Sequence, residues 1–411
     1  MAKVLPFKAV RPHREKVSLV SSRSYESYTD SELGAQLEFN PYSFLHIVNP
    51  GYKFQHETPS SERFKMVKNR YTEYKENNIL LKDKKASFYI YRKVSKNHEY
   101  CGIIAATSSE DYENNSIKKH EETIKDREIL FGKYLKKVGF NAEPILLTYP
   151  DNSEIQKIID KYKNQRSEYE FTSQNMNSHQ LWLVSDDVDI EKITSEFKKI
   201  KALYIADGHH RSASSAIVSK NLKENNPSHN GTEDYNFFMS FLIPESSLKI
   251  SSFNRFIRDL NGLTKHQFLI ELDKLFRITN LGQQLYKPSK KHHFSMYLDG
   301  EFYSLYLRKT IYKIENPLSD LDAQLLFDTV LKPILGITNL RDGEKIKYKP
   351  GKNAEIDLKT EVDSEKFKVS FGLFPATVDQ LKAIADANLK MPPKSTYIEP
   401  KLRSALTLYE F

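Results

Sequence analysis

The stretch YIADGHHRSA, Tyr204–Ala213, contains the local pattern that most restricts the fold of this 411-residue chain. A short apolar strand, Ala202–Ala206, runs into Asp207-Gly208, and an amphipathic helix is predicted to begin at once and to continue to about Leu222. The first turn of a helix has free backbone N–H groups and a partial positive charge. The sequence therefore predicts a strand–turn–helix element that can hold an anion such as a phosphate group.

The polar residues of this element suit that chemistry. Gly208 lets backbone approach a ligand without a Cβ in the way, and Arg211 can bind a phosphate through two parallel hydrogen bonds. His209 and His210 can donate hydrogen bonds, but adjacent histidines lie on different helix faces and no cysteine accompanies them, which argues against zinc. Asp207 has two interpretations, an ordinary helix N-cap or a ligand of phosphate-bound Mg²⁺.

Further strand and helix patterns lie on both sides of this element. The predicted strands are Ala86–Tyr91, Tyr100–Ala106, Gln180–Val184, Phe237–Ile243 and Lys366–Phe374. The predicted helices are Lys118–Val138, Glu154–Tyr162, Thr264–Phe276, Asp322–Leu331 and Val378–Asn388, the last with a Thr377/Gln380 capping box. Asp299-Gly300 predicts the tight turn of a hairpin. Because strands are joined by hairpins as well as through helices, we expect an α+β fold rather than a doubly wound sheet.

Composition excludes several classes of protein. The chain has 62 Lys+Arg and 54 Asp+Glu, a net charge of +8, and the two signs are interspersed, so a nucleic-acid partner is not expected. Its single cysteine, Cys101, lies in a predicted buried strand, which favours an inert thiol. The apolar runs, such as Phe237–Pro244, are shorter than the ~20 residues of a membrane helix. With no signal-peptide pattern at its start, the chain is expected to be soluble and cytoplasmic, with no membrane partner.

A second candidate cluster is KHEETIKDR, Lys119–Arg127. If it starts a helix, Glu121 could act as a general base on a substrate hydroxyl and Arg127 could neutralise a transferring phosphate. The alternative is an ordinary charged helix start, in which Glu121 and Glu122 balance the helix dipole.

A third cluster is MPPKSTYIEPK, Met391–Lys401. Lys394 is a suitable phosphate ligand, and the hydroxyls of Ser395 and Thr396 can reach Mg²⁺ or phosphate oxygens, although the stretch is not a P-loop. The alternative is a proline-stiffened loop that enters a C-terminal strand, Leu402–Tyr409.

Two isolated residues rank lower. His46 either lines a pocket or, as we favour, is a half-buried histidine packed by Phe44. Arg255 is either a phosphate ligand or, as we favour, a cation on the surface of a helix.

ADGHHR is similar to the phosphate-binding signature of the ParB/sulfiredoxin superfamily, in which a strand leads into G-x-x-R at a helix start. The whole chain resembles the bacterial family known as domain of unknown function 1015. The matching stretches are Pro6–Pro12, Asn40–Pro50, Lys119–Arg127, Ala206–Arg211, Phe253–Leu260, Leu321–Ile337 and Met391–Leu406.

The resemblance implies a ParB/sulfiredoxin-like core that carries the strand–DGHHR–helix element, with further mixed α/β elaborations. It implies a nucleotide-binding region at residues 1–249 and a closely integrated α+β region at 250–411. In this superfamily ParB proteins bind CTP and DNA, sulfiredoxins use ATP, and free-serine kinases use ADP. The DGHHR form is most similar to the last group, and His209 stands where sulfiredoxins have their cysteine.

From the resemblance we expect a nucleotide-dependent phosphotransferase that acts on a small hydroxyl metabolite, with ATP or ADP, or CTP as a third candidate, and Mg²⁺. Asp207, Gly208, Arg211, Arg127, Lys394, Ser395 and Thr396 would bind nucleotide and metal, and Glu121, His209 and His210 would be catalytic. The alternatives are a ParB-like regulatory or DNA-associated protein and a nucleotide hydrolase. No basic helix-turn-helix follows residue 225, which counts against DNA binding. The oligomeric state stays open.

Overall fold

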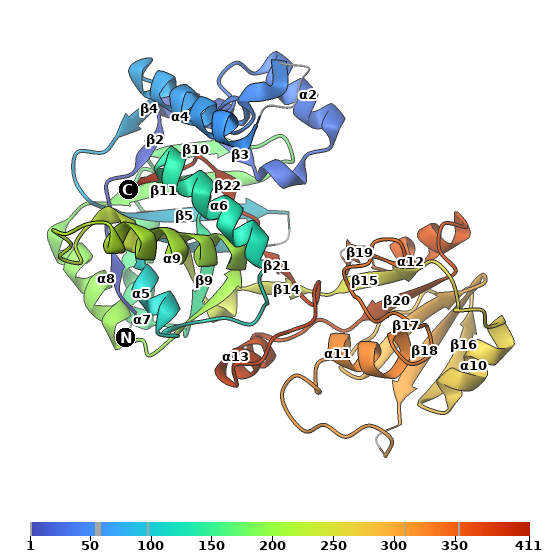
Figure 1. The fold of residues 1–411 in the computed structure, drawn as a ribbon. Helices are drawn as coiled ribbons and strands as arrows, with labels where there is room; N and C mark the ends of the chain where they lie inside the picture. Colours follow the sequence, from blue (N-terminus) through green and yellow to red (C-terminus); the bar gives the residue numbers. More distant parts are fainter. Residues whose placement is uncertain (1, 54–58, 97, 309, 352–353) are drawn as a thin grey trace. The chain divides into compact units, whose positions relative to one another are not determined.

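The computed structural model describes residues 2–53, 59–96, 98–308, 310–351 and 354–411. The chain divides into two compact units (Figure 1). Unit 1 consists of Met1–Lys119, Thr123–Leu248 and Pro400–Phe411, and unit 2 of His120–Glu122 and Lys249–Glu399. The C-terminal segment of the chain therefore belongs to the same unit as the DGHHR element.

Unit 1 is built on a nine-stranded mixed sheet in the order β10-β11-β5-β6-β13-β9-β12-β7, with β1 paired to β6. The β13–β9 and β12–β7 pairs are parallel and the other pairs antiparallel. The strands are β1 (Val4–Leu5), β5 (Phe88–Ser95), β6 (His98–Ser108), β7 (Ile117–Lys118), β9 (Ile145–Tyr149), β10 (Tyr169–Thr172), β11 (Ser178–Val184), β12 (Leu203–Asp207) and β13 (Phe237–Pro244). A mixed sheet of this kind, accompanied by helices, confirms the predicted α+β class.

The helices of unit 1 are α1 (Val17–Val20), α2 (Asp30–Phe39), α3 (Leu45–Val48), α4 (Ser60–Glu76), α5 (Ser109–Glu113), α6 (Lys125–Val138), α7 (Ser153–Lys163), α8 (Asp187–Lys199) and α9 (His209–Glu224). Three two-stranded ladders join distant segments. They pair β2 (Val10–Pro12) with β4 (Leu80–Lys82), β3 (Ser22–Arg23) with β22 (Arg403–Ser404), and β8 (Phe140–Asn141) with β23 (Tyr409–Glu410). The last two ladders attach the C-terminal segment to unit 1.

Helices α7 and α8 pack on one face of the large sheet. The apolar positions of α7 recur at helical spacing, as predicted, and Ile155, Ile159 and Tyr162 are buried. They share one apolar cluster with Phe197 of α8 and Ile205 of β12. Burying such a side chain contributes about 1.5–3 kcal/mol, so this cluster holds β12 firmly in the sheet.

Helix α9 packs against α6. The Oγ of Ser214 in α9 donates a hydrogen bond to the carbonyl of Glu128 in α6 over 3.0 Å, and the buried Gly132 of α6 lets the two helices approach closely. Sheet and α6 together fix where α9 begins, directly at the end of β12.

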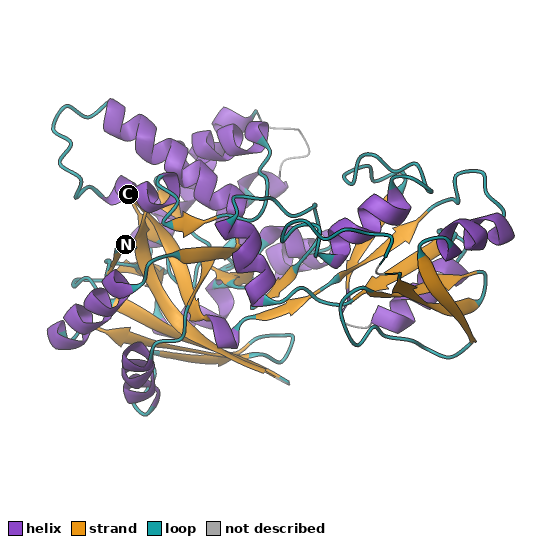
Figure 2. Ribbon diagram, turned by 90° about the horizontal axis from the view of Figure 1, so that it is seen from below, coloured by secondary structure: helices purple, strands orange, loops and turns teal. Residues whose placement is uncertain are grey.

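Unit 2 contains a six-stranded antiparallel sheet in the order β16-β18-β17-β20-β15-β19 (strands orange in Figure 2). Its strands are β15 (Phe253–Ile257), β16 (Phe276–Gly282), β17 (His293–Leu298), β18 (Glu301–Leu307), β19 (Ile346–Pro350) and β20 (Val369–Leu373), and β14 (Lys249–Ser251) pairs separately with β21 (Tyr397–Glu399). The helices are α10 (Lys265–Asp273), α11 (Asp322–Leu326), α12 (Ala354–Asp363) and α13 (Val378–Asp386), and a π-helix, Phe327–Leu331, continues α11.

Local signals in unit 2 correctly predicted a hairpin turn and a helix cap. Asp299 and Gly300 have φ of 49° and 81° and connect β17 to β18, as the hairpin prediction requires. Both hydrogen bonds of the predicted Thr377/Gln380 capping box are present at the start of α13.

Three predictions of secondary structure were wrong. The helix expected from Lys118 begins only at Lys125, because His120 is fully buried and its carbonyl accepts a hydrogen bond from the Met391 amide. The expected strand Leu402–Tyr409 is divided between β22 and β23, which pair with different partners. Arg255 lies in the buried strand β15 rather than on a helix surface.

Candidate functional site

The candidate site lies at the junction of β12 and α9. Gly208 is the N-cap of α9 with φ 101° and ψ 28°, a left-handed conformation that favours glycine. A Cβ at this position would lie 3.2 Å from the Arg211 guanidinium. Gly208 occupies the N-cap position of α9, so Asp207 lies one residue before the cap rather than at it. A glycine has no side chain that could cap the helix from this position, and the backbone N–H groups of the first turn lie at the junction.

Two cations and two carboxylates surround this junction. Asp207 Oδ2 lies 3.1 Å from Arg211 Nη2, and Asp207 Oδ1 lies 2.9 Å from Lys401 Nζ. Arg211 Nη1 also lies 3.2 Å from Glu143 Oε1 and donates a hydrogen bond of 2.8 Å to the Pro144 carbonyl. The Asp207 side chain is 36% exposed and that of Arg211 is 21% exposed, so solvent reaches the cluster.

This geometry changes the chemistry available to Asp207. Both of its oxygens are engaged by cations, so a Mg²⁺ ion would have to displace Lys401 or Arg211 from the carboxylate. Arg211 and Lys401, in contrast, are held beside the positive end of a helix by ion pairs that an incoming anion can share.

The two predicted histidines differ in burial. His209 is buried and His210 is half-buried, as expected for neighbours in the first turn of a helix. Ser212 Oγ donates to the His209 carbonyl over 2.9 Å and closes this turn. The first turn of α9 thus carries one imidazole with access to solvent and one without.

The KHEETIKDR cluster does not form one helical face. His120 and Glu121 precede α6 and belong to unit 2, with 4.0 Å between His120 Nε2 and a Glu121 carboxylate oxygen. Arg127 lies in the first turn of α6 in unit 1, where its side chain is exposed. The stretch is therefore not one helix start, because residues 119–124 precede α6.

The MPPKSTYIEPK cluster is also divided between the units. Lys394 is exposed in unit 2 with φ 57°, and its Nζ lies 5.3 Å from the centre of the Phe253 ring. Ser395 is buried and its Oγ donates to the Pro392 carbonyl over 2.7 Å, and Thr396 is buried as well. Lys401, at the end of the same stretch, belongs to unit 1 and is the residue that reaches Asp207.

Sequence reasoning missed Lys401 and Glu143 as neighbours of the DGHHR element. The sequence could have indicated Lys401, because it lies in Met391–Leu406, one of the stretches on which the family resemblance rests. The sequence gives no indication of Glu143, since its approach to Arg211 depends on the pairing of β9 with β12.

The lower-ranked residues are structural. The His46 ring is half-buried beside the buried Phe44 and lies 3.0 Å from the Asn40 carbonyl, which agrees with the favoured interpretation. Arg255 is 2% exposed, and burial lowers its pKa to about 10. Burial raises the pKa of the Cys101 thiol to about 12, so the thiol stays protonated and inert at neutral pH, as expected.

Comparison with known proteins identifies a family. The profile of a family described as "Protein of unknown function (DUF1015)" matches residues 4–324. No curated protein matches the chain. Within the described residues, none of the helices combines the length and the apolar character that a bilayer crossing requires.

Eight chains of known structure match. They include a C-terminally truncated SbnI from Staphylococcus aureus, with 11% identity, coverage of 74% of this chain and 87% of that chain, and a TM-score of 0.38. A mutant free serine kinase in complex with AMP has 13% identity, coverage of 71% and 90%, and a TM-score of 0.37. A conserved hypothetical protein from Pyrococcus furiosus has 11% identity, coverage of 76% and 97%, and a TM-score of 0.34. Similarity at this level does not establish a shared fold.

Proposed function

The chain belongs to the DUF1015 family of proteins of unknown function, and on that premise we propose that it is a nucleotide-dependent phosphotransferase whose nucleotide phosphates bind at the start of α9. One observation carries the proposal. The helix begins at a left-handed glycine directly after a buried strand, and Arg211 and Lys401 lie beside its first turn, both paired with Asp207.

The physical basis of the proposed phosphate binding is the electrostatic field at the start of α9. The first-turn N–H groups and the helix dipole favour negative charge, and a charge-assisted bond from a guanidinium is worth more than a neutral hydrogen bond. Phosphoryl transfer depends mainly on positioning and on neutralising charge, and this junction offers both.

Asp207 and Glu143 hold the two cations in place while no phosphate is bound. When phosphate binds, Lys401 moves from Asp207 Oδ1 to a phosphate oxygen, because the ammonium stem is flexible and exposed. The carboxylate oxygen released in this way would be available to hold the Mg²⁺ that accompanies ATP or ADP, and the metal would neutralise phosphate charge there. This exchange reconciles the metal prediction at Asp207 with its two ion pairs.

The remaining roles rest on the sequence. His209 and His210 would stabilise charge during transfer, and Glu121 would be the general base. Arg127, Lys394, Ser395 and Thr396 stay predicted ligands, and a ParB/sulfiredoxin-like core stays a prediction. The acceptor is a small hydroxyl compound, with free serine suggested by the resemblance of DGHHR to free-serine kinases.

The test supplies ATP, ADP and CTP, each with and without Mg²⁺, together with a pool of amino acids and hydroxyl metabolites, and measures phosphorylated products by mass spectrometry. We expect a product that requires Mg²⁺ and that decreases about 10- to 100-fold in Arg211→Ala, the loss of one charge-assisted pair. Arg166→Ala, an exposed arginine of unit 1, is the matched control and keeps full activity. Consumption of nucleotide without any acceptor product would instead indicate a hydrolase, and no consumption at all would contradict the proposal.

A further inference from the structure

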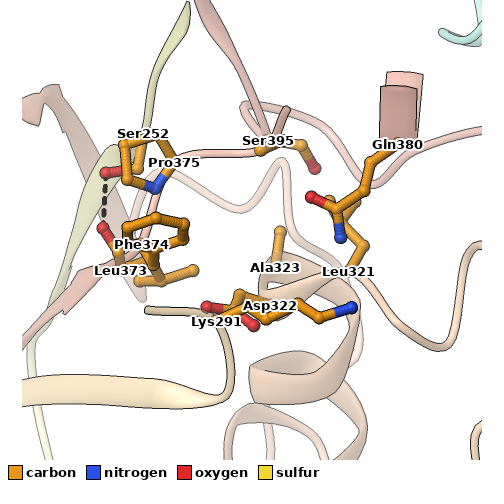
Figure 3. A pocket seen from close by; sticks show the side chains of 11 residues that line it. Ser252, Lys291, Leu321, Asp322, Ala323, Leu373, Phe374, Pro375, Gln380 and Ser395 are labelled. Atoms are coloured by element: carbon orange, nitrogen blue, oxygen red, sulfur yellow. Dashed lines mark hydrogen bonds between the residues drawn. The ribbon is translucent and has the colours of Figure 1, made fainter. Parts of the chain in front are cut away.

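Unit 2 contains a pocket whose lining includes a buried carboxylate, that of Asp322 (Figure 3). Its empty volume is about 270 Å³ including the mouth, and the enclosed part admits a group about the size of a water molecule. The polar residues that line it are Ser252, Lys291, Asp322, Gln380 and Ser395, from segments far apart in the sequence. In Figure 3, Asp322 and Ser395 lie on opposite sides of the hollow.

Asp322 is the central polar group of this pocket. Asp322 is only 5% exposed. Oδ1 accepts a hydrogen bond of 2.8 Å from the His292 amide, whereas Oδ2 is buried and has no hydrogen-bond partner among the described residues. A buried oxygen without a hydrogen-bond partner is unfavourable, so a ligand that donates to Oδ2 would remove that cost.

The two serines present only acceptors to the pocket. Ser252 Oγ donates its hydrogen to the Leu373 carbonyl over 2.8 Å, and Ser395 Oγ donates to the Pro392 carbonyl over 2.7 Å. Each hydroxyl therefore has lone pairs left and no hydrogen to give. With Asp322 Oδ2, the pocket offers acceptors to a ligand that brings donors.

The neighbouring cations are engaged elsewhere. Lys291 Nζ lies 2.6 Å from Asp320 Oδ2, and the His292 ring lies 3.0 Å from Asp320 Oδ1. Arg255 donates to the Phe253 carbonyl over 2.5 Å and forms no ion pair with a carboxylate in the described ranges. These basic side chains therefore act on Asp322 from a distance, and none of them forms an ion pair with its carboxylate in the described residues.

We propose that this pocket binds the primary ammonium group of a small molecule, with Asp322 Oδ2 as its counter-charge and the Ser252 and Ser395 hydroxyls as further acceptors. An ammonium group has three donors, a positive charge and nearly the size of a water molecule, so it matches each property of the pocket. A carboxylate would be repelled by the Asp322 carboxylate, and a neutral alcohol has one donor and no charge. The site lies wholly in unit 2 and shares no residue with the phosphate site proposed at the junction of β12 and α9.

The protonation of Asp322 gives the binding a pH signature. Burial raises the pKa of this carboxyl to about 7, opposed first by the hydrogen bond from the His292 amide and then by the charges of Lys291 and Arg255, while the charge of Asp320 raises it further. A bound ammonium favours the carboxylate and lowers its pKa, so binding below neutrality must release a proton. Amine affinity is therefore expected to rise between pH 6 and pH 8 as the empty pocket loses its proton.

The experiment titrates the full-length protein with three small probes of similar size, ethylammonium chloride, ethanol and sodium acetate, by calorimetry at pH 6 and pH 8. The backbone amide of His292, which bonds Asp322, is followed by NMR. We expect ethylammonium to bind saturably at millimolar concentration, more tightly at pH 8, with a shift of the His292 amide. Ethanol and acetate should leave both signals unchanged.

Asp322→Asn tests the counter-charge, because its side-chain oxygen can still accept from His292 while the charge is lost. It should weaken ethylammonium at least tenfold, whereas Asp328→Asn, an exposed carboxylate on the adjoining π-helix, should not. If Asp322→Asn does not fold, Ser395→Ala and the pH dependence of the wild type decide the question. No saturable ethylammonium binding, equal binding of acetate, or binding that ignores pH and Asp322 would each overturn the proposal and leave the pocket a water site.

Discussion

The Nζ of Lys401 lies 2.9 Å from the Oδ1 of Asp207, although the two residues are 194 positions apart in the sequence. The contact brings the C-terminal segment of unit 1 to the start of α9, where Arg211 holds the other oxygen of the same carboxylate. A cation that reaches the DGHHR element from the far end of the chain is the strongest structural support for an anion site there.

Replacing this cation should affect binding more than stability. Lys401→Ala is expected to weaken nucleotide binding several-fold, because one phosphate ligand is lost. The free energy of unfolding should change by less than about 1 kcal/mol, since an exposed ion pair contributes little. Lys137→Ala, an exposed lysine of α6, is the control. Calorimetric titration and thermal melts measure the two effects, and unchanged affinity in Lys401→Ala would remove this residue from the site.

The left-handed glycine gives a second prediction. Gly208→Ala should lower stability by about 1–3 kcal/mol, the cost of a residue held in a sparsely populated backbone conformation, and should also abolish nucleotide binding because the Cβ would crowd Arg211. Gly231→Ala is the matched control, since Gly231 has φ 88° but no atom lies within 4 Å of the place that an added Cβ would take. Both variants should melt earlier, and only Gly208→Ala should lose nucleotide. If Gly231→Ala loses it equally, the effect is one of general strain.

Acid should destabilise the attachment of the C-terminal segment. Glu410 accepts a hydrogen bond of 2.7 Å from Tyr71 and pairs with Lys75 and Lys82 at 2.6 and 2.9 Å. Although burial opposes the shift, these bonds lower the pKa of Glu410 to about 2. Because the folded-state pKa lies below the unfolded value of about 4.3, the stabilisation is present above pH ~4.3 and is lost as pH falls toward 2.

Glu410→Gln should therefore be less stable than the wild type at pH 7, and the difference should shrink below pH 4. Urea unfolding at a series of pH values measures it. A constant difference across that range would show that the charge of Glu410 contributes nothing.

The single thiol gives a prediction about reactivity. Cys101 lies in β6, where burial raises its pKa to about 12, so a thiol reagent should modify the folded protein at least about 100-fold more slowly than the urea-unfolded chain at the same pH. The rate of colour release from a disulfide reagent measures both states. Equal rates would mean that β6 opens readily.

Features that depend on neighbours in sequence were predicted, and features that depend on distant contacts were not. The periodicity of α7 and the hairpin turn at Asp299-Gly300 are local, so pattern alone identified them. The helix predicted through His120 is absent there. The buried His120 side chain and the hydrogen bond from the Met391 amide to the His120 carbonyl hold that segment in a non-helical conformation. For Arg255, a charged residue suggested exposure, whereas its strand is buried on both sides.

In the candidate site, too, local features were predicted from the sequence and long-range contacts were not. Gly208 and Arg211 were identified from the strand-to-helix pattern, because the pattern itself places them in one turn. Neither the approach of Lys401 to Asp207 nor the buried Oδ2 of Asp322, which has no hydrogen-bond partner in the described part of the chain, has a signature in the sequence, since each depends on how separate segments pack.

Direct nucleotide binding tests the central claim most simply. Calorimetric titration of the wild type with ATP and ADP, with and without Mg²⁺, should show saturable binding that weakens with salt, and Arg211→Ala should weaken it about 10- to 100-fold. Absence of binding at millimolar nucleotide, or equal binding by the wild type and Arg211→Ala, would contradict a phosphate site at the start of α9.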